Sequence, residues 1–358
     1  MRRSEEIMAP GAKRALAFAA ALAAAQLACS SSPSTVLVRP VALAVAGSGV
    51  LYVADAAENV IWVVAPGGSV TALAGTPGQT GSLDGTGPTA EFNAPSGVAL
   101  DATGNLFVTD YGNHTIRKVS PQGLVSTFAG IAGQPGFADG TGSAALFNRP
   151  WGIAVAPAGS PAEGTLFVAD AGNSTIRAIS PAGVVTTFAG TAGQPGSADG
   201  TGGAASFDWP AGVAFDGSGN LYVADYVNDT VRVISPAAVV STLAGTAGQA
   251  GSVDGTGAEV VFHNPAGVGV DGSGNVFVAD SVNDTIRKVT PAPAVSTLAG
   301  APGQVGSSDG MGSAALFNHP YGLAMDSSGN VYVADSLNGL VRLVTPAGLV
   351  TTINTSGR

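Results

Sequence analysis

The stretch that decides the fold is VFVADSVNDTIRKVTPAPAVSTLAG, residues 276–300. Near-copies of it are LFVTDYGNHTIRKVSPQGLVSTFAG, which begins at residue 106, and LFVADAGNSTIRAISPAGVVTTFAG, which begins at residue 166. Self-similarity at a fixed period is the sequence signature of a repeat architecture. The repeat therefore has to be measured before any single residue is interpreted.

The repeat occurs six times at an almost constant spacing. A proline opens each unit, and successive prolines are 55, 55, 60, 55 and 55 residues apart: Pro40, Pro95, Pro150, Pro210, Pro265 and Pro320. A five-residue insertion within APAGSPAEG, residues 156–164, accounts for the longer interval. The repeats therefore form one array, which we assign to residues 40–358.

Each unit contains four short segments rich in β-branched and aromatic residues, bounded by turn residues. In the second unit these segments are SGVALD (96–101), NLFVTD (105–110), TIRKVS (115–120) and LVSTFAG (124–130). Four antiparallel strands joined by tight turns form one small sheet, and six such sheets bury both faces only when arranged in a ring. The terminal units match the middle ones, which disfavours a capped solenoid. The sequence predicts an all-β, six-bladed β-propeller of four-stranded antiparallel blades.

Composition excludes several classes of protein. Hydrophobic residues make up 45% of the chain and charged residues 11%, a balance too apolar for disorder. A net charge of −10 argues against nucleic acid and against a polybasic lipid-binding surface. The single cysteine, Cys29, permits no internal disulfide. We expect a monomer.

The first 29 residues have the pattern of a targeting segment. Lys13 and Arg14 precede the apolar run ALAFAAALAAAQLAC, which ends at Cys29 and resembles a bacterial lipoprotein signal. Met8 offers a cleaner start than Met1, and residues 30–39 form a Ser/Pro-rich linker. The expected location is outside the cytoplasm, with the chain lipid-anchored at Cys29, or secreted if Cys29 is not acylated. This anchor is the only membrane attachment that the sequence predicts.

The consensus P-x-G-V/I-A-x-D-x-x-G-N-L/V-x-V-A-D-x-x-N-x-T-I-R-K resembles the NHL repeat, and it covers all six units. The resemblance implies a six-bladed propeller that serves as a binding platform, although a minority of similar propellers are lyases or lactonases. Unit one departs from the pattern, with Ala42 in place of the first glycine and Trp62 in place of the repeated arginine. It is therefore a candidate for the ring closure, in which STVLV (34–38) would pair with the last blade.

The polar residues that recur in every unit are interpreted first as structural. Asp110 and Asn113 flank the loop between strands two and three, where such side chains accept backbone N–H bonds. The repeated arginine is expected to pair with an aspartate of its own or the next blade. DGSGN (216–220 and 271–275) and the DGTG motifs read as turns, with structural calcium as the alternative.

An enzymatic function is disfavoured, and no catalytic residue, metal ligand or cofactor is predicted. A zinc site needs converging ligands, whereas His114 lies in a different loop from His263 and His319. The alternative function is an NHL-like propeller enzyme, either a lyase or a lactone or ester hydrolase, with or without a metal.

The face that carries the long segments between units is the expected binding face, because long loops are usually functional. Residues there that differ from blade to blade are the candidates for ligand recognition: Arg149, Trp151, Trp209, His263, His319, Tyr321, Tyr111 and Tyr226. Aromatic residues and arginine anchor interfaces. The sequence thus predicts binding of a protein, peptide or glycan outside the cytoplasm. In the alternative interpretation, Trp151, Trp209 and Tyr321 only fill the central channel.

Overall fold

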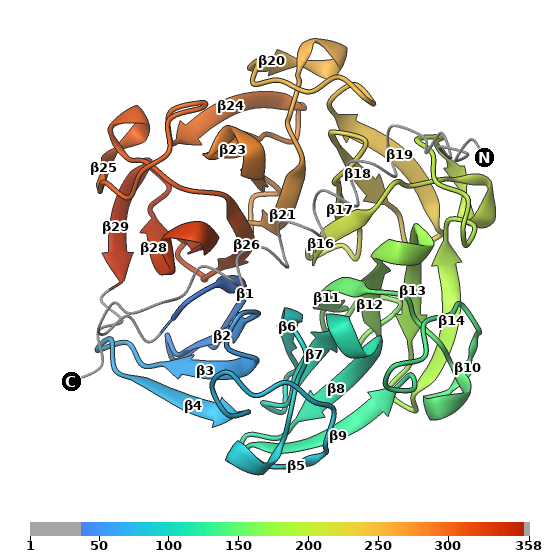
Figure 1. Ribbon diagram of the computed structural model, residues 1–358. Coiled ribbons are helices and arrows are strands. Elements are labelled where there is room, and N and C mark those ends of the chain that lie inside the picture. Colours follow the sequence, from blue (N-terminus) through green and yellow to red (C-terminus); the bar gives the residue numbers. More distant parts are fainter. Residues whose placement is uncertain (1–36, 354–358) are drawn as a thin grey trace, which may run out of the picture. The chain divides into compact units, whose positions relative to one another are not determined.

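The computed structural model describes residues 37–353, which form a closed ring of six small antiparallel sheets around a central axis (Figure 1). The expected all-β six-bladed propeller is confirmed. The predicted lipidation site Cys29 and residues 34–36 of the predicted closing strand lie outside the described residues. Within the described part of the chain, no helix is both long and apolar enough to cross a membrane.

Each sheet runs outward from the axis in sequence order. The innermost strands, called the hub, are β1 (Pro40–Val45), β6 (Pro95–Leu100), β11 (Pro150–Val155), β16 (Pro210–Phe215), β21 (Pro265–Val270) and β26 (Pro320–Met325). The second strands are β2 (Leu51–Asp55), β7 (Leu106–Asp110), β12 (Leu166–Asp170), β17 (Leu221–Asp225), β22 (Val276–Asp280) and β27 (Val331–Asp335).

The third strands are β3 (Val60–Val64), β8 (Thr115–Val119), β13 (Thr175–Ile179), β18 (Thr230–Ile234), β23 (Thr285–Val289) and β28 (Leu340–Val344). The fourth strands are β4 (Val70–Ala74), β9 (Leu124–Ala129), β14 (Val184–Ala189), β19 (Val239–Ala244), β24 (Ala294–Ala299) and β29 (Leu349–Ile353). The second and third strands pair without a register shift, so that Val108 of the second strand faces Arg117 of the third, whereas the pairing of the first and second strands contains a register shift.

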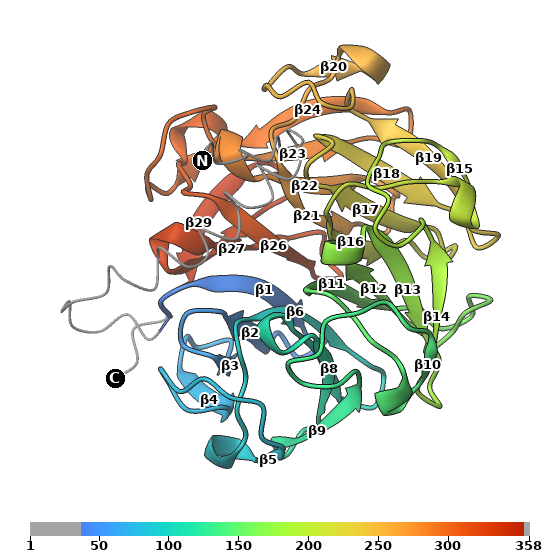
Figure 2. The same cartoon turned by 45° about the vertical axis from the view of Figure 1, so that its right-hand side comes forward.

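The segment between one blade and the next, here called the connector, adds a fifth strand that the sequence did not predict. A two-residue strand of each connector pairs with the outer edge of the blade that follows it: β5 (Gly85–Thr86), β10 (Gly140–Thr141), β15 (Gly200–Thr201), β20 (Gly255–Thr256) and β25 (Gly310–Met311). Figure 2 shows β10, β15 and β20 at the outer rim. Each of these connectors therefore forms hydrogen bonds with the outer edge of the next blade before the chain continues inward to that blade's first strand.

Single turns of 3-10 helix complete the structure. Five of these turns follow the fifth strands: η2 (Gly87–Thr89), η4 (Gly142–Ala144), η6 (Gly202–Ala204), η7 (Gly257–Glu259) and η9 (Gly312–Ala314). Four more form loops between second and third strands: η3 (Tyr111–Asn113), η5 (Ala171–Asn173), η8 (Ser281–Asn283) and η10 (Ser336–Asn338). The connectors and these loops share one side of the ring, here called the connector face.

The hydrophobic core lies between adjacent blades. Phe167 and Ile176 of blade three, for example, pack in one cluster with Val213 and Leu221 of blade four. The seam between blades six and one has its own cluster, in which the fully buried Leu37 joins residues of both blades. Residues 37–39 are not in a strand, so within the described residues packing closes the ring.

The hub strands approach so closely that the repeated glycine is required there. A Cβ atom placed on Gly267 would lie 2.0 Å from the carbonyl oxygen of Tyr321 in the next blade, far inside van der Waals contact. The corresponding atom on Gly152 would lie 2.3 Å from the carbonyl oxygen of Ala211. The channel along the axis consequently narrows to a cavity of about 50 Å³ lined by all six innermost strands.

Candidate functional site

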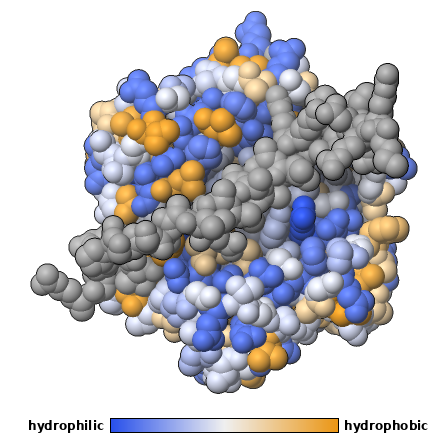
Figure 3. Space-filling view, in the orientation of Figure 1, coloured by the Kyte–Doolittle hydropathy of each residue, from blue (hydrophilic) through white to orange (hydrophobic). Residues whose placement is uncertain are grey.

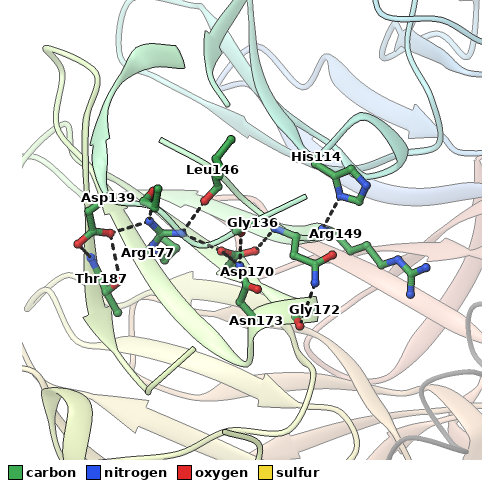
Figure 4. A network of polar contacts seen from close by, with 12 residues as sticks. His114, Gly136, Asp139, Leu146, Arg149, Asp170, Gly172, Asn173, Arg177 and Thr187 are labelled. Atoms are coloured by element: carbon green, nitrogen blue, oxygen red, sulfur yellow. Dashed lines mark hydrogen bonds and ion pairs between the residues drawn. The ribbon is translucent and has the colours of Figure 1, made fainter. Parts of the chain in front are cut away.

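The repeated aspartate, asparagine and arginine of each blade form a buried network, shown for blade three in Figure 4. Asp170 is fully buried and accepts hydrogen bonds from Asn173 Nδ2 at 2.8 Å and Arg177 Nη1 at 2.9 Å. Nη2 of Arg177 reaches the connector carboxylate of Asp139 at 2.6 Å, and the guanidinium lies 5.2 Å from the ring centre of Phe147. The prediction of a structural role for these residues is confirmed.

The same arginine bridge recurs in four other blades, each time between a buried aspartate and a half-exposed connector aspartate. The pairs with the buried aspartate are Arg117–Asp110 (2.8 Å), Arg232–Asp225 (2.9 Å), Arg287–Asp280 (2.7 Å) and Arg342–Asp335 (2.8 Å). The arginine therefore binds the aspartate of its own blade and also that of the connector before it. These groups hold each connector against the sheet.

Burial dominates the electrostatics of this network. Desolvation raises the pKa of four aspartates to about 6, although the paired arginine opposes the shift: Asp110, Asp170, Asp225 and Asp280. Such values suit general acid–base chemistry, but both oxygens of Asp170 already accept hydrogen bonds from the protein. The raised pKa therefore reflects a buried structural pair and does not indicate a catalytic carboxylate.

The motifs considered for calcium have their carboxylates engaged within the fold. Oδ1 of Asp84 in the first DGTG accepts bonds from Arg117 at 2.8 Å and Thr127 at 3.0 Å. Asp216 of DGSGN accepts the backbone N–H groups of Ser218 and Asn220, each at 2.9 Å, as an aspartate in a hairpin turn does. In residues 37–353 no group of three or more His, Cys, Asp and Glu side chains could hold a metal ion.

The candidate aromatic residues come together at the hub, on the connector face. The ring centre of Trp151 lies 5.3 Å from that of Tyr111 and 6.2 Å from that of Tyr321, which belongs to the opposite blade. Trp151, Trp209, Tyr111, Tyr226 and Tyr321 are each 8% exposed or less. Of these residues, Trp151 lines the central cavity.

The polar candidates Arg149, His263 and His319 are more accessible. All three are partly exposed, and the His319 side chain is 34% exposed. Nδ1 of His319 lies 3.6 Å from the carboxylate of Asp284. Their partial exposure makes them better candidates for ligand contact than the buried rings.

Sequence reasoning missed the backbone conformation of the residue before five of the six opening prolines. These residues have a left-handed backbone with φ between 50° and 57°: Ala94, Arg149, Trp209, Asn264 and His319. The conformation costs about 1–3 kcal/mol in a non-glycine residue. A polar side chain of the preceding blade accepts the N–H group, as His114 Nδ1 does for Arg149 at 3.0 Å and Asp284 does for His319 at 2.8 Å.

His114 is thus an acceptor that supports the connector. Burial, together with the charge of Arg149, lowers the pKa of His114, which keeps Nδ1 unprotonated. The only sequence signal for this role was variation at this position, four residues after the last residue of the second strand. The six blades carry there Asn59, His114, Ser174, Asp229, Asp284 and Gly339. The structure also places a hydroxyl pair, Ser96 and Thr109, under the carbonyl of Trp151. No sequence signal pointed to that pair.

These observations define a six-bladed β-propeller with a closed hub and a variable connector face. The profile of the NHL repeat matches residues 92–119, 207–234 and 317–342. The chain is an NHL-repeat propeller.

Curated relatives carry the same repeat in longer chains. The chain is 31% identical over 327 residues to NHL repeat-containing protein 2 of Bos taurus, a match that covers 82% of this chain and 44% of that protein. It is 30% identical over 285 residues to the chloroplastic protein SUPPRESSOR OF QUENCHING 1 of Arabidopsis thaliana, which covers 75% of this chain and 26% of the relative. The chain thus spans less than half the length of these relatives.

Solved structures share the fold at low sequence identity. An auxiliary nutrient binding protein from Bacteroides thetaiotaomicron superposes with a TM-score of 0.63 at 13% identity, covering 88% of this chain and 69% of that one. Virginiamycin B lyase from Staphylococcus aureus superposes with a TM-score of 0.54 at 12% identity, covering 88% and 84%. The fold therefore accommodates both binding proteins and enzymes, and it does not decide between them.

Proposed function

We propose that this protein is a non-enzymatic, extracytoplasmic binding propeller that presents its connector face to a protein, peptide or glycan partner. One observation carries the proposal. The polar residues that recur from blade to blade make hydrogen bonds and ion pairs within the fold, whereas the candidate residues that differ between blades lie on the connector face. A surface whose side chains differ from blade to blade, on a scaffold of repeated blades, is suited to recognising a partner.

The chemistry of the face supports a polar partner. Arg149 and His319 are partly exposed, and each stands two residues before a buried aromatic residue, Trp151 or Tyr321. Arginine and aromatic residues are enriched in interfaces. One face of the ring, shown in Figure 3, mixes hydrophilic and hydrophobic residues, with the hydrophobic groups scattered over several blades. The auxiliary nutrient binding proteins among the structural neighbours are consistent with binding. The signal-like segment that ends at Cys29 supports a location outside the cytoplasm.

The test combines a glycan array with cross-linking on intact cells, using purified protein. The double variant Arg149→Ala/His319→Ala removes the two accessible side chains without touching the buried rings. The matched control is Gln122→Ala/Glu163→Ala, which alters exposed residues on the opposite side of the ring. We expect at least a tenfold loss of captured ligand in the first variant and none in the control, with ~1.4 kcal/mol corresponding to each factor of ten. Equal capture by both variants would remove the connector face from consideration.

A further inference from the structure

The five-residue insertion in unit three covers a pocket on the side of the ring opposite the connector face. The loop between β11 and β12 contains this insertion, and its residues Ser160, Pro161 and Ala162 line the pocket. The opposite wall comes from blade four, including Gly219 and Pro236 in two of its turns. Gly219 is approached so closely that a Cβ atom there would lie 3.2 Å from that of Ser160.

The interior of the pocket is apolar and largely aromatic. Its floor consists of buried residues, Phe167, Leu221 and Ile234, while Phe188 and Phe215 form partly exposed walls. Phe167 lies edge-to-face with Phe188 at 4.9 Å and with Phe215 at 5.1 Å between ring centres. The cavity measures about 120 Å³. A cavity of ~150 Å³ lined by Leu, Ile and Phe is known to stay dry and to bind benzene.

The polar groups at the rim are satisfied by the protein itself. Ser160 Oγ donates to the carbonyl of Pro157 at 2.7 Å, and Ser235 Oγ accepts the N–H group of Val239 at 3.2 Å. No titratable side chain lines this pocket. Glu163 in the same loop accepts the N–H group of Gly159 at 2.9 Å. A charged ligand would therefore lose its hydration without gaining a partner.

We infer that this pocket is a second ligand site, which takes a small neutral aromatic molecule. The volume admits one six-membered ring. A ring bound between the blades could pack against the lining phenylalanine rings as these rings pack against one another. The loop that covers the site is preformed, because its own backbone hydrogen bonds, such as Gly164 N–H to the Ala156 carbonyl at 3.1 Å, fix it. Binding would therefore require little ordering. The inference is independent of the proposed partner on the connector face.

The probe is fluorobenzene, followed by ¹⁹F NMR line broadening with the full-length protein. If the six ring carbons of fluorobenzene are well packed in the pocket, its dissociation constant is expected to be on the order of 1 mM. Ala162→Leu places a larger side chain in the pocket and is expected to weaken binding at least about tenfold. The matched control is Ala158→Leu, the same substitution at an exposed position of the same loop, which should bind like the parent protein.

A second variant guards against misfolding. Phe215→Leu removes one aromatic wall but introduces the residue that the second blade already carries at the equivalent end of its first strand, Leu100. It is expected to weaken binding several-fold, and fluorobenzoate is expected to bind the parent protein at least about tenfold less tightly than fluorobenzene. The inference is overturned if the parent protein does not broaden the fluorobenzene signal, if folded Ala162→Leu binds as well as Ala158→Leu, or if fluorobenzoate binds equally well.

Discussion

Replacing Arg232 with methionine tests whether the repeated arginine is the main support of a blade. The side chain is fully buried, donates to Asp225 at 2.9 Å and Asp199 at 2.7 Å, and binds the carbonyls of Ser206 and Ala198 at 3.0 Å each. Methionine keeps much of the volume but leaves the buried carboxylate of Asp225 without a cation. Removing one partner of a buried ion pair costs about 3–5 kcal/mol, and we expect Arg232→Met to lower the free energy of unfolding by that amount.

The measurement is urea unfolding followed by tryptophan fluorescence, with the midpoints compared at a common slope. Burial raises the pKa of Asp225 to about 6 in the parent protein, and removing the arginine raises it further. A protonated carboxyl needs no cation, so the loss of stability should be smaller at pH 5 than at pH 8. The control Arg149→Met removes a guanidinium that lies outside these bridges.

Two results would refute the reasoning behind this prediction. A loss below about 1 kcal/mol would mean that the network contributes no more than an exposed ion pair. A loss that is identical at pH 5 and pH 8 would mean that the uncompensated charge of Asp225 is not its cause.

Three further predictions concern stability. Burial raises the pKa of four aspartates from the ordinary 3.8 to about 6 in the folded protein, so their contribution to stability is fully present below pH 4 and is lost as the pH rises through 6. Connector aspartates such as Asp84 have a lowered pKa in the folded protein, so their contribution to stability is lost as the pH falls below 4. The midpoint temperature of thermal unfolding should therefore be highest near pH 4 and should fall as the pH rises from 4 to 6. Gly267→Ala should cost more than about 2 kcal/mol because its Cβ meets a backbone carbonyl, whereas Gly272→Ala, with open space around it, should cost less than about 1. Leu37→Ala should cost about 2–5 kcal/mol by opening a cavity at the seam, and Leu83→Ala, 60% exposed, should be nearly neutral by the same urea assay.

The sequence alone predicted the ring, the number of blades and the four main strands of each, because all of these follow from spacing and strand propensity. It did not predict the fifth strands. A two-residue segment such as Gly85–Thr86, half of it glycine, is too short to show a strand pattern of its own, and it becomes a strand by pairing with the outer edge of the next blade. Elements created by tertiary contact leave little local pattern to recognise.

Sequence reasoning gave the relative positions of three candidate rings but not their exposure. Strand alternation correctly placed Trp151, Tyr321 and Tyr111 together on one face, but it carried no information on how far each ring enters the channel. Their burial depends on the diameter of the hub, which close glycine contacts such as that of Gly267 determine. The pocket under the insertion also escaped prediction, since it requires two blades to be in place.

Unit one shows how the repeats act as an internal comparison. Trp62 stands where the other blades carry arginine, and Leu37 stands three residues before the opening proline, where the other blades carry the phenylalanine that stacks on that arginine. Both members of a contacting pair are thus replaced together. Asp55 remains buried, and four backbone N–H groups bind it, including those of Val38 at 2.7 Å and Arg39 at 3.1 Å.

The sequence revealed the change at Trp62 but not the one at Leu37, because residues 30–39 were assigned to a linker. The structure shows that the seam has exchanged an ionic, stacked pair for an apolar one while keeping the backbone contacts of the aspartate. A position that changes only together with its neighbour in the fold is under a packing constraint. Positions that vary independently of such neighbours, as Arg149 and His319 do, are free to be selected for binding, which is why the connector face and not the repeated network is the place to look for a partner.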